Sequence, residues 1–193
     1  MKGGWLVGLV AVVVLAYITL NTLRTERLDP LPAGARLPPF AMPLARVASD
    51  DADARVSADA CRVRGPDVLN SCELGDGRPV VLAFVVTGAG DCADQVDALD
   101  RVAPRFPGVG FAAVAVRGDP DDLRALVRRR GWTVPVGYDH DGAVSIEYGL
   151  SAVCPLLTFG DREGRVAGSS LGVLDAAALT ERVEALVAGR PLP

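Results

Sequence analysis

Two uninterrupted apolar runs constrain the fold of this chain more than any other feature. Residues 79–86 (PVVLAFVV) and 109–116 (VGFAAVAV) are rich in β-branched side chains and carry no charge. Such runs are typical of strands that are covered on both faces of a sheet. Between them, residues 91–103 place Cys92 and Leu99 on one apolar helical stripe. A strand, a helix and a second strand in this order predict an α/β fold with parallel strand pairs.

The alternation of element types continues to the C-terminus. We expect, in order, a helix from Asp121 or Asp122 to Gly131, a strand at 135–139, a short helix at 143–149, a hairpin of strands at 154–160 and 165–172, and a closing helix from Asp175. This order requires a mixed central sheet with helices on both faces. Right-handed crossovers between the parallel strands remove most alternative topologies.

The N-terminal segment is apolar enough to cross a membrane. Residues 5–20 (WLVGLVAVVVLAYITL) carry no charge. With the two preceding glycines the run spans about 18 residues, or roughly 27 Å as a helix, which is near the thickness of a bilayer core. We therefore expect a transmembrane anchor or signal-anchor at 1–23. A cleavable signal peptide is the alternative, but residues 21–24 (NTLR) form a poor cleavage site.

The rest of the chain divides into a linker and one domain. Residues 24–39 are rich in proline and lack a periodic apolar pattern, which predicts a stiff spacer. The domain then occupies 40–193, with an insert at about 48–72 that starts with a solvated, acidic loop.

The four cysteines indicate an oxidising compartment. Cys61 and Cys72 flank a short loop, and a structural disulfide between them would contribute about 2–3 kcal/mol by loop closure. An even cysteine count after an export-like N-terminus favours a domain outside the cytoplasm. The sequence therefore predicts a membrane-anchored, extracytoplasmic protein.

Charge and motif content exclude several functions. The chain has 24 acidic and 20 basic side chains, a net charge of −4, and Lys2 as its only lysine, so it lacks the basic field that nucleic acid requires. Its one histidine, His140, falls in a turn where we expect it to be solvated, and zinc would need four ligands. Gly88 and Gly90 are not followed by the Lys-Ser/Thr of a phosphate loop. We therefore expect no metal and no cofactor.

Several strings, in this order, resemble the thioredoxin superfamily. They are GARLPPF (34–40), RPVVLAF (78–84), GWTVPVGYDHDGAVSIEYGL (131–150) and CPLLTFGDREGRVAG (154–168). The resemblance is closest to the membrane-anchored extracytoplasmic branch, the TlpA-type thiol–disulfide reductases and redoxins, and covers about residues 34–188. It implies a thioredoxin-like α/β fold behind the N-terminal transmembrane helix.

The cysteines depart from the pattern of that family. Its active-site helix begins with Cys-x-x-Cys, of which the first cysteine attacks the substrate and the second resolves the mixed disulfide. Here Ala89 stands at the attacking position and Cys92 at the resolving one. The resemblance also implies that the loop ending in the active-site proline, usually cis, lies against the start of this helix. Pro155 is that proline, so Cys154 is expected near Cys92, where Cα atoms within about 4.4–6.8 Å would permit a disulfide.

Two functions remain open from the sequence. In the first, the domain is a divergent thiol–disulfide oxidoreductase that uses Cys92 and Cys154, with Pro155 and the Cys154 backbone holding a protein thiol or disulfide substrate. In the second, it is a redox-silent thioredoxin-like binding or scaffolding module with structural disulfides only. Taken alone, Cys92 fits a packed apolar group somewhat better than a catalyst, because Asp91 places a negative charge beside it and the second position of the motif is the more buried one.

A peroxiredoxin ranks below both of these functions. Those enzymes place a threonine three residues before the reactive cysteine and supply an arginine from a later strand. Here Thr87 precedes Cys92 by five residues, and the strand from Cys154 lacks the arginine.

Overall fold

The structure is a computed structural model. It describes residues 12, 14, 29–51, 53–88, 90–150 and 153–193. Apart from Val12 and Val14, which are helical, the anchor expected at 1–23 lies outside these residues. No helix in the described part of the chain is long and apolar enough to span a bilayer.

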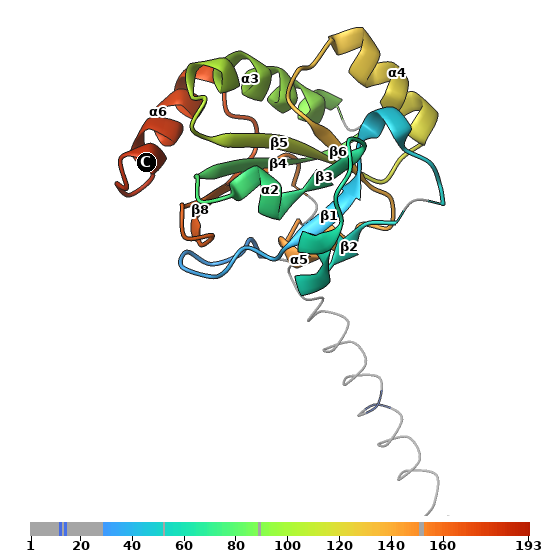
Figure 1. Cartoon of the computed structure of the whole chain (residues 1–193), viewed down its shortest axis with the longest axis horizontal. Coiled ribbons are helices and arrows are strands. Elements are labelled where there is room, and N and C mark those ends of the chain that lie inside the picture. The colour runs from blue at the N-terminus through green and yellow to red at the C-terminus, as the bar shows by residue number, and fades with distance from the viewer. Residues whose placement is uncertain (1–11, 13, 15–28, 52, 89, 151–152) are drawn as a thin grey trace, which may run out of the picture.

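A five-stranded mixed sheet forms the centre of the domain (Figure 1). The strand order is β6-β5-β4-β7-β8; β4, β5 and β6 run parallel, and β7 and β8 run antiparallel to their neighbours. The strands are β4 Val80–Val86, β5 Gly110–Val116, β6 Val136–Asp139, β7 Leu156–Gly160 and β8 Val166–Leu171. This mixed sheet confirms the α/β class predicted from the two apolar runs.

The helices follow the expected order, with shifts at their ends. They are η3 Gly90–Ala93, α3 Asp94–Val102, η4 Ala103–Arg105, α4 Pro120–Arg130, α5 Ala143–Glu147 and α6 Ala176–Val187, where η marks a 3-10 helix. Helix α4 begins at Pro120, before the expected Asp121 or Asp122, because the Asp119 side chain accepts hydrogen bonds from the backbone N–H groups of those two residues. Asp175 caps α6 in the same way, as expected.

Alternate side chains of β4 face two separate cores. Val81 and Val85 pack into a core that includes Leu99 of α3 and Val183 of α6. Phe84 faces a second core with Tyr148, which follows α5. Both faces of β4 are therefore covered, as the continuous apolar run requires.

A second, three-stranded sheet was not expected. It consists of β1 Phe40–Pro43, β2 Arg55–Val56 and β3 Val68–Asn70 in the order β2-β1-β3, accompanied by η1 Ala45–Val47, η2 Ala58–Arg62 and α2 Ser71–Gly75. The prediction of a solvated loop at 48–60 is therefore wrong for β2 and for the start of η2. Strand β2 is only two residues long and pairs with β1 through its backbone, so its side chains carry no strand pattern.

The described part of the expected spacer lies against the domain. The Gly34 and Leu37 N–H groups donate to the carbonyls of Val166 (2.8 Å) and Gly164 (2.9 Å). The Tyr148 hydroxyl donates to the Pro38 carbonyl at 2.8 Å. From about Gly34 onward the segment is thus part of the folded unit, because these backbone groups find partners on the β7–β8 hairpin and beside α5.

Candidate functional site

The first half of the site is the step from β4 into the helical region. Strand β4 ends at Val86, and the chain turns at Gly88, whose φ of 82° is favourable for glycine only. Cys92 follows inside η3 and is 3 % exposed, packed in the core beneath α3. Ala89, which occupies the position of the usual attacking cysteine, lies outside the described residues.

The second half of the site is the loop before β7. The Cys154–Pro155 peptide bond is cis, as the resemblance implied. Strand β7 pairs antiparallel with β4, with Leu156 opposite Phe84. Continued by two residues, this register places Cys154 opposite Val86, the last residue of β4, at the same edge of the sheet as Cys92.

The structure joins the two predicted cysteines. A disulfide links Cys92 to Cys154, which are 62 positions apart in sequence, with their Cα atoms 5.7 Å apart. Pro155 follows directly and is buried. The three residues predicted for catalysis thus lie together, although Cys92 is distant in sequence from Cys154 and Pro155.

One backbone amide contacts both sulfur atoms. The Val86 N–H donates to Cys92 Sγ at 3.3 Å and to Cys154 Sγ at 3.1 Å. Cys154 Sγ also lies 4.0 Å from the Phe84 carbonyl oxygen. An N–H group in this position would stabilise a thiolate formed on either sulfur when the bond is reduced. Sequence reasoning missed this group, because no side-chain pattern marks a backbone donor.

The two cysteines differ in their exposure to solvent. Cys154 is partly exposed, whereas Cys92 is buried. The Gly172 N–H donates to the Pro155 carbonyl at 2.9 Å, which continues the β7–β8 pairing and brings Val173 alongside the Cys154 segment. Val153 and Val173 are 47 % and 51 % exposed. Two exposed apolar residues therefore flank the Cys154 segment.

A polar network supports the turn after β4. The Thr87 hydroxyl donates to the Arg117 carbonyl at 3.2 Å, and the Tyr138 hydroxyl donates to the Gly118 carbonyl at 2.7 Å. Gly118 has a φ of 88°, and a Cβ atom there would overlap the Thr87 hydroxyl. These contacts hold the loop after β5 against the turn that leads to Cys92. The pair of Gly118 with Thr87 was not predicted, because the two residues are 31 positions apart.

His140 is less solvated than expected. Its Nδ1 atom lies 3.1 Å from the Tyr138 hydroxyl and 3.9 Å from Asp50 Oδ1, and the side chain is 35 % exposed. Burial raises the pKa of the Tyr138 hydroxyl, and the charges of Asp50 and Asp119 raise it further. Tyr138 therefore stays neutral and acts as a hydrogen-bond group of the loop.

Asp139 is a buried carboxylate with a structural role. It is fully buried and accepts from the Val144 N–H at 3.2 Å, the Ser145 N–H at 2.8 Å and the Ser145 hydroxyl at 2.5 Å. Burial raises the pKa of the Asp139 carboxyl, opposed by these hydrogen bonds. Its partners all lie at the start of α5, so it anchors that helix to the end of β6.

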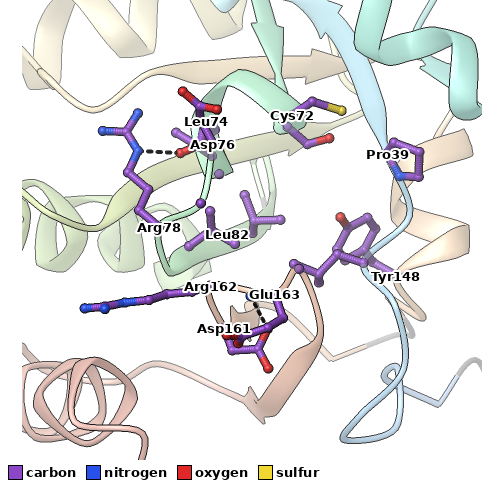
Figure 2. Close-up of a pocket in the computed structure, with 16 residues that line it drawn as sticks. Pro39, Cys72, Leu74, Asp76, Arg78, Leu82, Tyr148, Asp161, Arg162 and Glu163 are labelled. Carbon is purple, nitrogen blue, oxygen red and sulfur yellow. Dashed lines mark hydrogen bonds between the residues drawn. The ribbon is translucent and has the colours of Figure 1, made fainter.

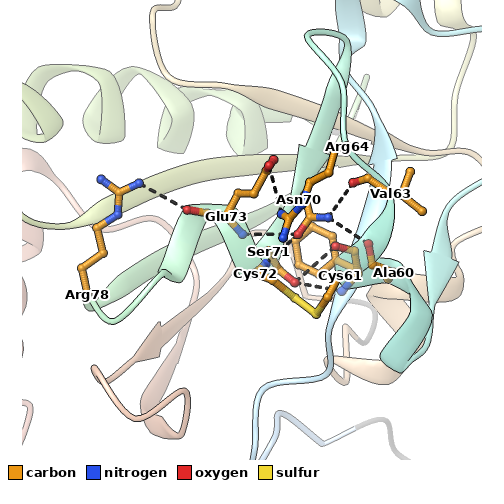
Figure 3. Close-up of polar contacts among 10 residues, drawn as sticks. Ala60, Cys61, Val63, Arg64, Asn70, Ser71, Cys72, Glu73 and Arg78 are labelled. Atoms are coloured by element: carbon orange, nitrogen blue, oxygen red, sulfur yellow. Dashed lines mark hydrogen bonds and ion pairs between the residues drawn. A yellow bond between two sulfur atoms is a disulfide. The ribbon is translucent and has the colours of Figure 1, made fainter.

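The second disulfide lies in the three-stranded sheet region (Figure 3). It joins Cys61 to Cys72 with Cα atoms 5.5 Å apart. This is the pair for which the sequence predicted a structural disulfide. Beside it, the buried Asn70 side chain accepts from the N–H groups of Cys72 (2.8 Å) and Glu73 (3.3 Å). The same side chain donates to the carbonyls of Ala60 (2.8 Å) and Val63 (2.7 Å). Asn70 and the disulfide thus fasten the same two segments together.

A cavity of about 320 Å³ lies at the opposite end of the sheet (Figure 2). Its lining includes Val80, where β4 begins, and Arg162 in the turn between β7 and β8. Leu82 and Tyr148 provide apolar surface within it. Because Cys92 and Cys154 lie where β4 ends, the length of that strand separates this cavity from the disulfide.

Comparisons with known proteins agree with the fold. A family model described as the AhpC/TSA family matches residues 50–168. A putative thiol:disulfide interchange protein DsbE from Chlorobium tepidum is 19 % identical, with a TM-score of 0.63 over 82 % of this chain and 97 % of that one. No curated protein sequence matches the chain significantly.

Two mycobacterial structures are also similar. A secreted Mycobacterium tuberculosis disulfide oxidoreductase, homologous to E. coli DsbE, is 20 % identical, with a TM-score of 0.53 over 84 % of this chain and 99 % of that one. The DsbF protein of MTB, solved in mixed oxidised and reduced forms, is 28 % identical, with a TM-score of 0.56 over 62 % of this chain and 87 % of that one.

Proposed function

The chain belongs to the AhpC/TSA family, and from this premise we propose that it is a thiol–disulfide oxidoreductase whose redox centre is the Cys92–Cys154 bond. The centre replaces the Cys-x-x-Cys pair of the thioredoxin superfamily, since Ala89 supplies no thiol. The substrate is a protein thiol or disulfide. We further propose that an N-terminal helix at 1–23 anchors the protein in a membrane and holds the domain outside the cytoplasm.

One observation carries the proposal. The disulfide lies at the end of β4 beside the cis proline, with Cys154 partly exposed and with the Val86 N–H directed at both sulfurs. A purely structural bond does not need a donor that stabilises its reduced form. Several solved structures with this fold are described as thiol:disulfide interchange proteins or disulfide oxidoreductases, which is consistent with exchange chemistry.

The proposed reaction is a pair of exchange steps. A thiolate of a client dithiol attacks one sulfur of the bond, which forms a mixed disulfide and releases the other sulfur as a thiolate that takes up a proton from water. The second client thiol then attacks the mixed disulfide. The client leaves oxidised, and the Cys92–Cys154 pair is left as a dithiol. The reverse sequence reduces a client disulfide.

The reduction potential of the bond tests this proposal. The full chain is purified in detergent as the Cys61→Ala/Cys72→Ala variant, which keeps only the Cys92–Cys154 bond, and is equilibrated with glutathione or dithiothreitol buffers. We expect a potential between about −270 and −120 mV, the range of known exchange proteins. A potential below about −300 mV would refute the oxidoreductase and leave a redox-silent binding or scaffolding module. The wild-type chain, with both bonds, is the control for correct folding.

A further inference from the structure

We propose that Cys154, the residue before the cis proline, is the sulfur that exchanges with the client, and that buried Cys92 is the leaving and resolving sulfur. This inference rests on the proposed function and names the sulfur that the client attacks. It moves the mixed disulfide from the start of the helix, where the superfamily has its attacking cysteine, to the loop before β7.

Access is the first argument. Thiol–disulfide exchange depends on which sulfur the incoming thiolate can reach. Cys92 is 3 % exposed and belongs to the core formed with Val96 and Leu99, so a client protein would have to displace α3 to reach its sulfur. Cys154 is partly exposed and follows Val153, which is 47 % exposed. Of the two cysteines, Cys154 is therefore the one that a client thiolate approaches from solvent.

Stabilisation of the leaving group is the second argument. Exchange is faster when the departing sulfur forms the more stable thiolate. Cys92 Sγ accepts the Val86 N–H at 3.3 Å and lies just before α3, where the helix dipole is positive. Cys154 Sγ accepts the same N–H at 3.1 Å but also lies 4.0 Å from the Phe84 carbonyl oxygen, whose partial negative charge disfavours a thiolate. The helix dipole and the lack of a facing carbonyl favour Cys92 as the leaving sulfur, whereas its burial and the neighbouring Asp91 oppose a thiolate there, so access is the stronger of the two arguments.

The shared amide also serves the return step. When the client thiolate bonds to Cys154 Sγ, the Cys92–Cys154 bond breaks and its electron pair stays on Cys92. When the second client thiol attacks the client sulfur of the mixed disulfide, the electron pair of that bond stays on Cys154. The Val86 N–H, 3.1 Å from that sulfur in the oxidised protein, is then placed to stabilise the second thiolate. One donor thus assists both departures.

Two single-cysteine variants test the assignment. Cys92→Ala leaves Cys154 as the free thiol of the site, and Cys154→Ala leaves Cys92; both keep the Cys61–Cys72 bond and the full chain. Each is reacted with 5,5′-dithiobis(2-nitrobenzoic acid) and with oxidised glutathione. We expect the Cys92→Ala variant to react at least roughly tenfold faster with each reagent and to retain a glutathione adduct, since no resolving thiol remains.

A second measurement uses the wild-type sequence, so its result does not depend on whether the variants fold. The reduced protein is treated with limiting iodoacetamide, and the first alkylated residue is identified by mass spectrometry. We expect Cys154 to be modified before Cys92. Equal rates, or faster reaction of Cys92, would overturn the assignment. If the reduction potential nevertheless lies in the exchange range, only this inference fails; a bond that resists reduction with neither thiol reactive overturns the proposed function as well.

Discussion

The two disulfides close loops of very different length. The proposed redox role can therefore be tested by the unfolding free energy that the protein loses when each bond is reduced. The bonded residues are 62 positions apart for Cys92–Cys154 and 11 apart for Cys61–Cys72. Loop-closure entropy alone then predicts contributions of about 4.3 and about 2.8 kcal/mol at 25 °C. If both bonds acted only as cross-links, reducing the bond that closes the longer loop would lower the unfolding free energy more.

The proposed function reverses that order. Reduction of Cys92–Cys154 yields a thiolate that keeps the Val86 N–H hydrogen bond in the folded protein and loses it in the unfolded chain. A hydrogen bond to a charged group contributes about 1.5–3 kcal/mol, which leaves a net loss on reduction of about 1.3–2.8 kcal/mol. Each 1.4 kcal/mol of this offset raises the reduction potential by about 30 mV. We therefore expect reduction of Cys92–Cys154 to lower the unfolding free energy no more than reduction of Cys61–Cys72 does.

The assay uses two variants, each with one bond left. Cys61→Ala/Cys72→Ala retains the Cys92–Cys154 bond, and Cys92→Ala/Cys154→Ala retains the other bond. The free energy of unfolding in urea is measured for the full chain in detergent at about pH 8, with and without reductant. A loss of about 4 kcal/mol or more on reducing Cys92–Cys154 would refute the reasoning, because it would show a bond that acts as a cross-link alone.

Three further predictions concern the framework of the domain. Asn70→Ala removes the four hydrogen bonds of this side chain and should lower the urea unfolding free energy by about 3–4 kcal/mol. Asn70→Ser keeps a cap acceptor and should lose less; equal losses would contradict the capping role. The pKa of the Asp139 carboxyl is raised in the folded protein, so this group stabilises the fold below its unfolded pKa of about 3.9, and the contribution is lost as pH rises through the folded pKa. Asp139→Asn should flatten this decline of the unfolding free energy with pH. An unchanged pH slope would contradict the assigned role. At Gly137 an added Cβ would overlap Met42 Sδ, so Gly137→Ala should cost about 1–3 kcal/mol in thermal or urea unfolding, while Gly108→Ala, which meets open space, serves as the neutral control.

The order of elements could be predicted because each element carries its own local signal. The apolar runs at 79–86 and 109–116 became β4 and β5 within one residue, since side chains buried on both faces leave no polar position in a strand. Asp175 marked the start of α6 because a side chain that accepts N–H groups is favoured at a helix N-terminus. Such signals depend on neighbours in sequence and are visible without coordinates.

The small sheet and the Thr87–Gly118 contact could not be predicted, for the opposite reason. Strand β2 has two residues and is held by backbone hydrogen bonds to β1, which are independent of side-chain identity. Gly118 lies beside Thr87 only because β4 and β5 are adjacent and end together. Contacts of this kind depend on the relative placement of whole elements.

The sequence by itself determined that this chain forms an α/β domain behind an apolar N-terminal segment, and that one cysteine sits at the start of a helix and another before a proline. Their nearness was implied by family resemblance and not by any local pattern. Only the tertiary structure decided that Cys92 is buried, that Cys154 is partly exposed and that Val86 donates to both sulfurs. The physical reason is that exposure and backbone hydrogen bonds at this site are created by the antiparallel pairing of β4 with β7, which brings together two cysteines that are 62 positions apart.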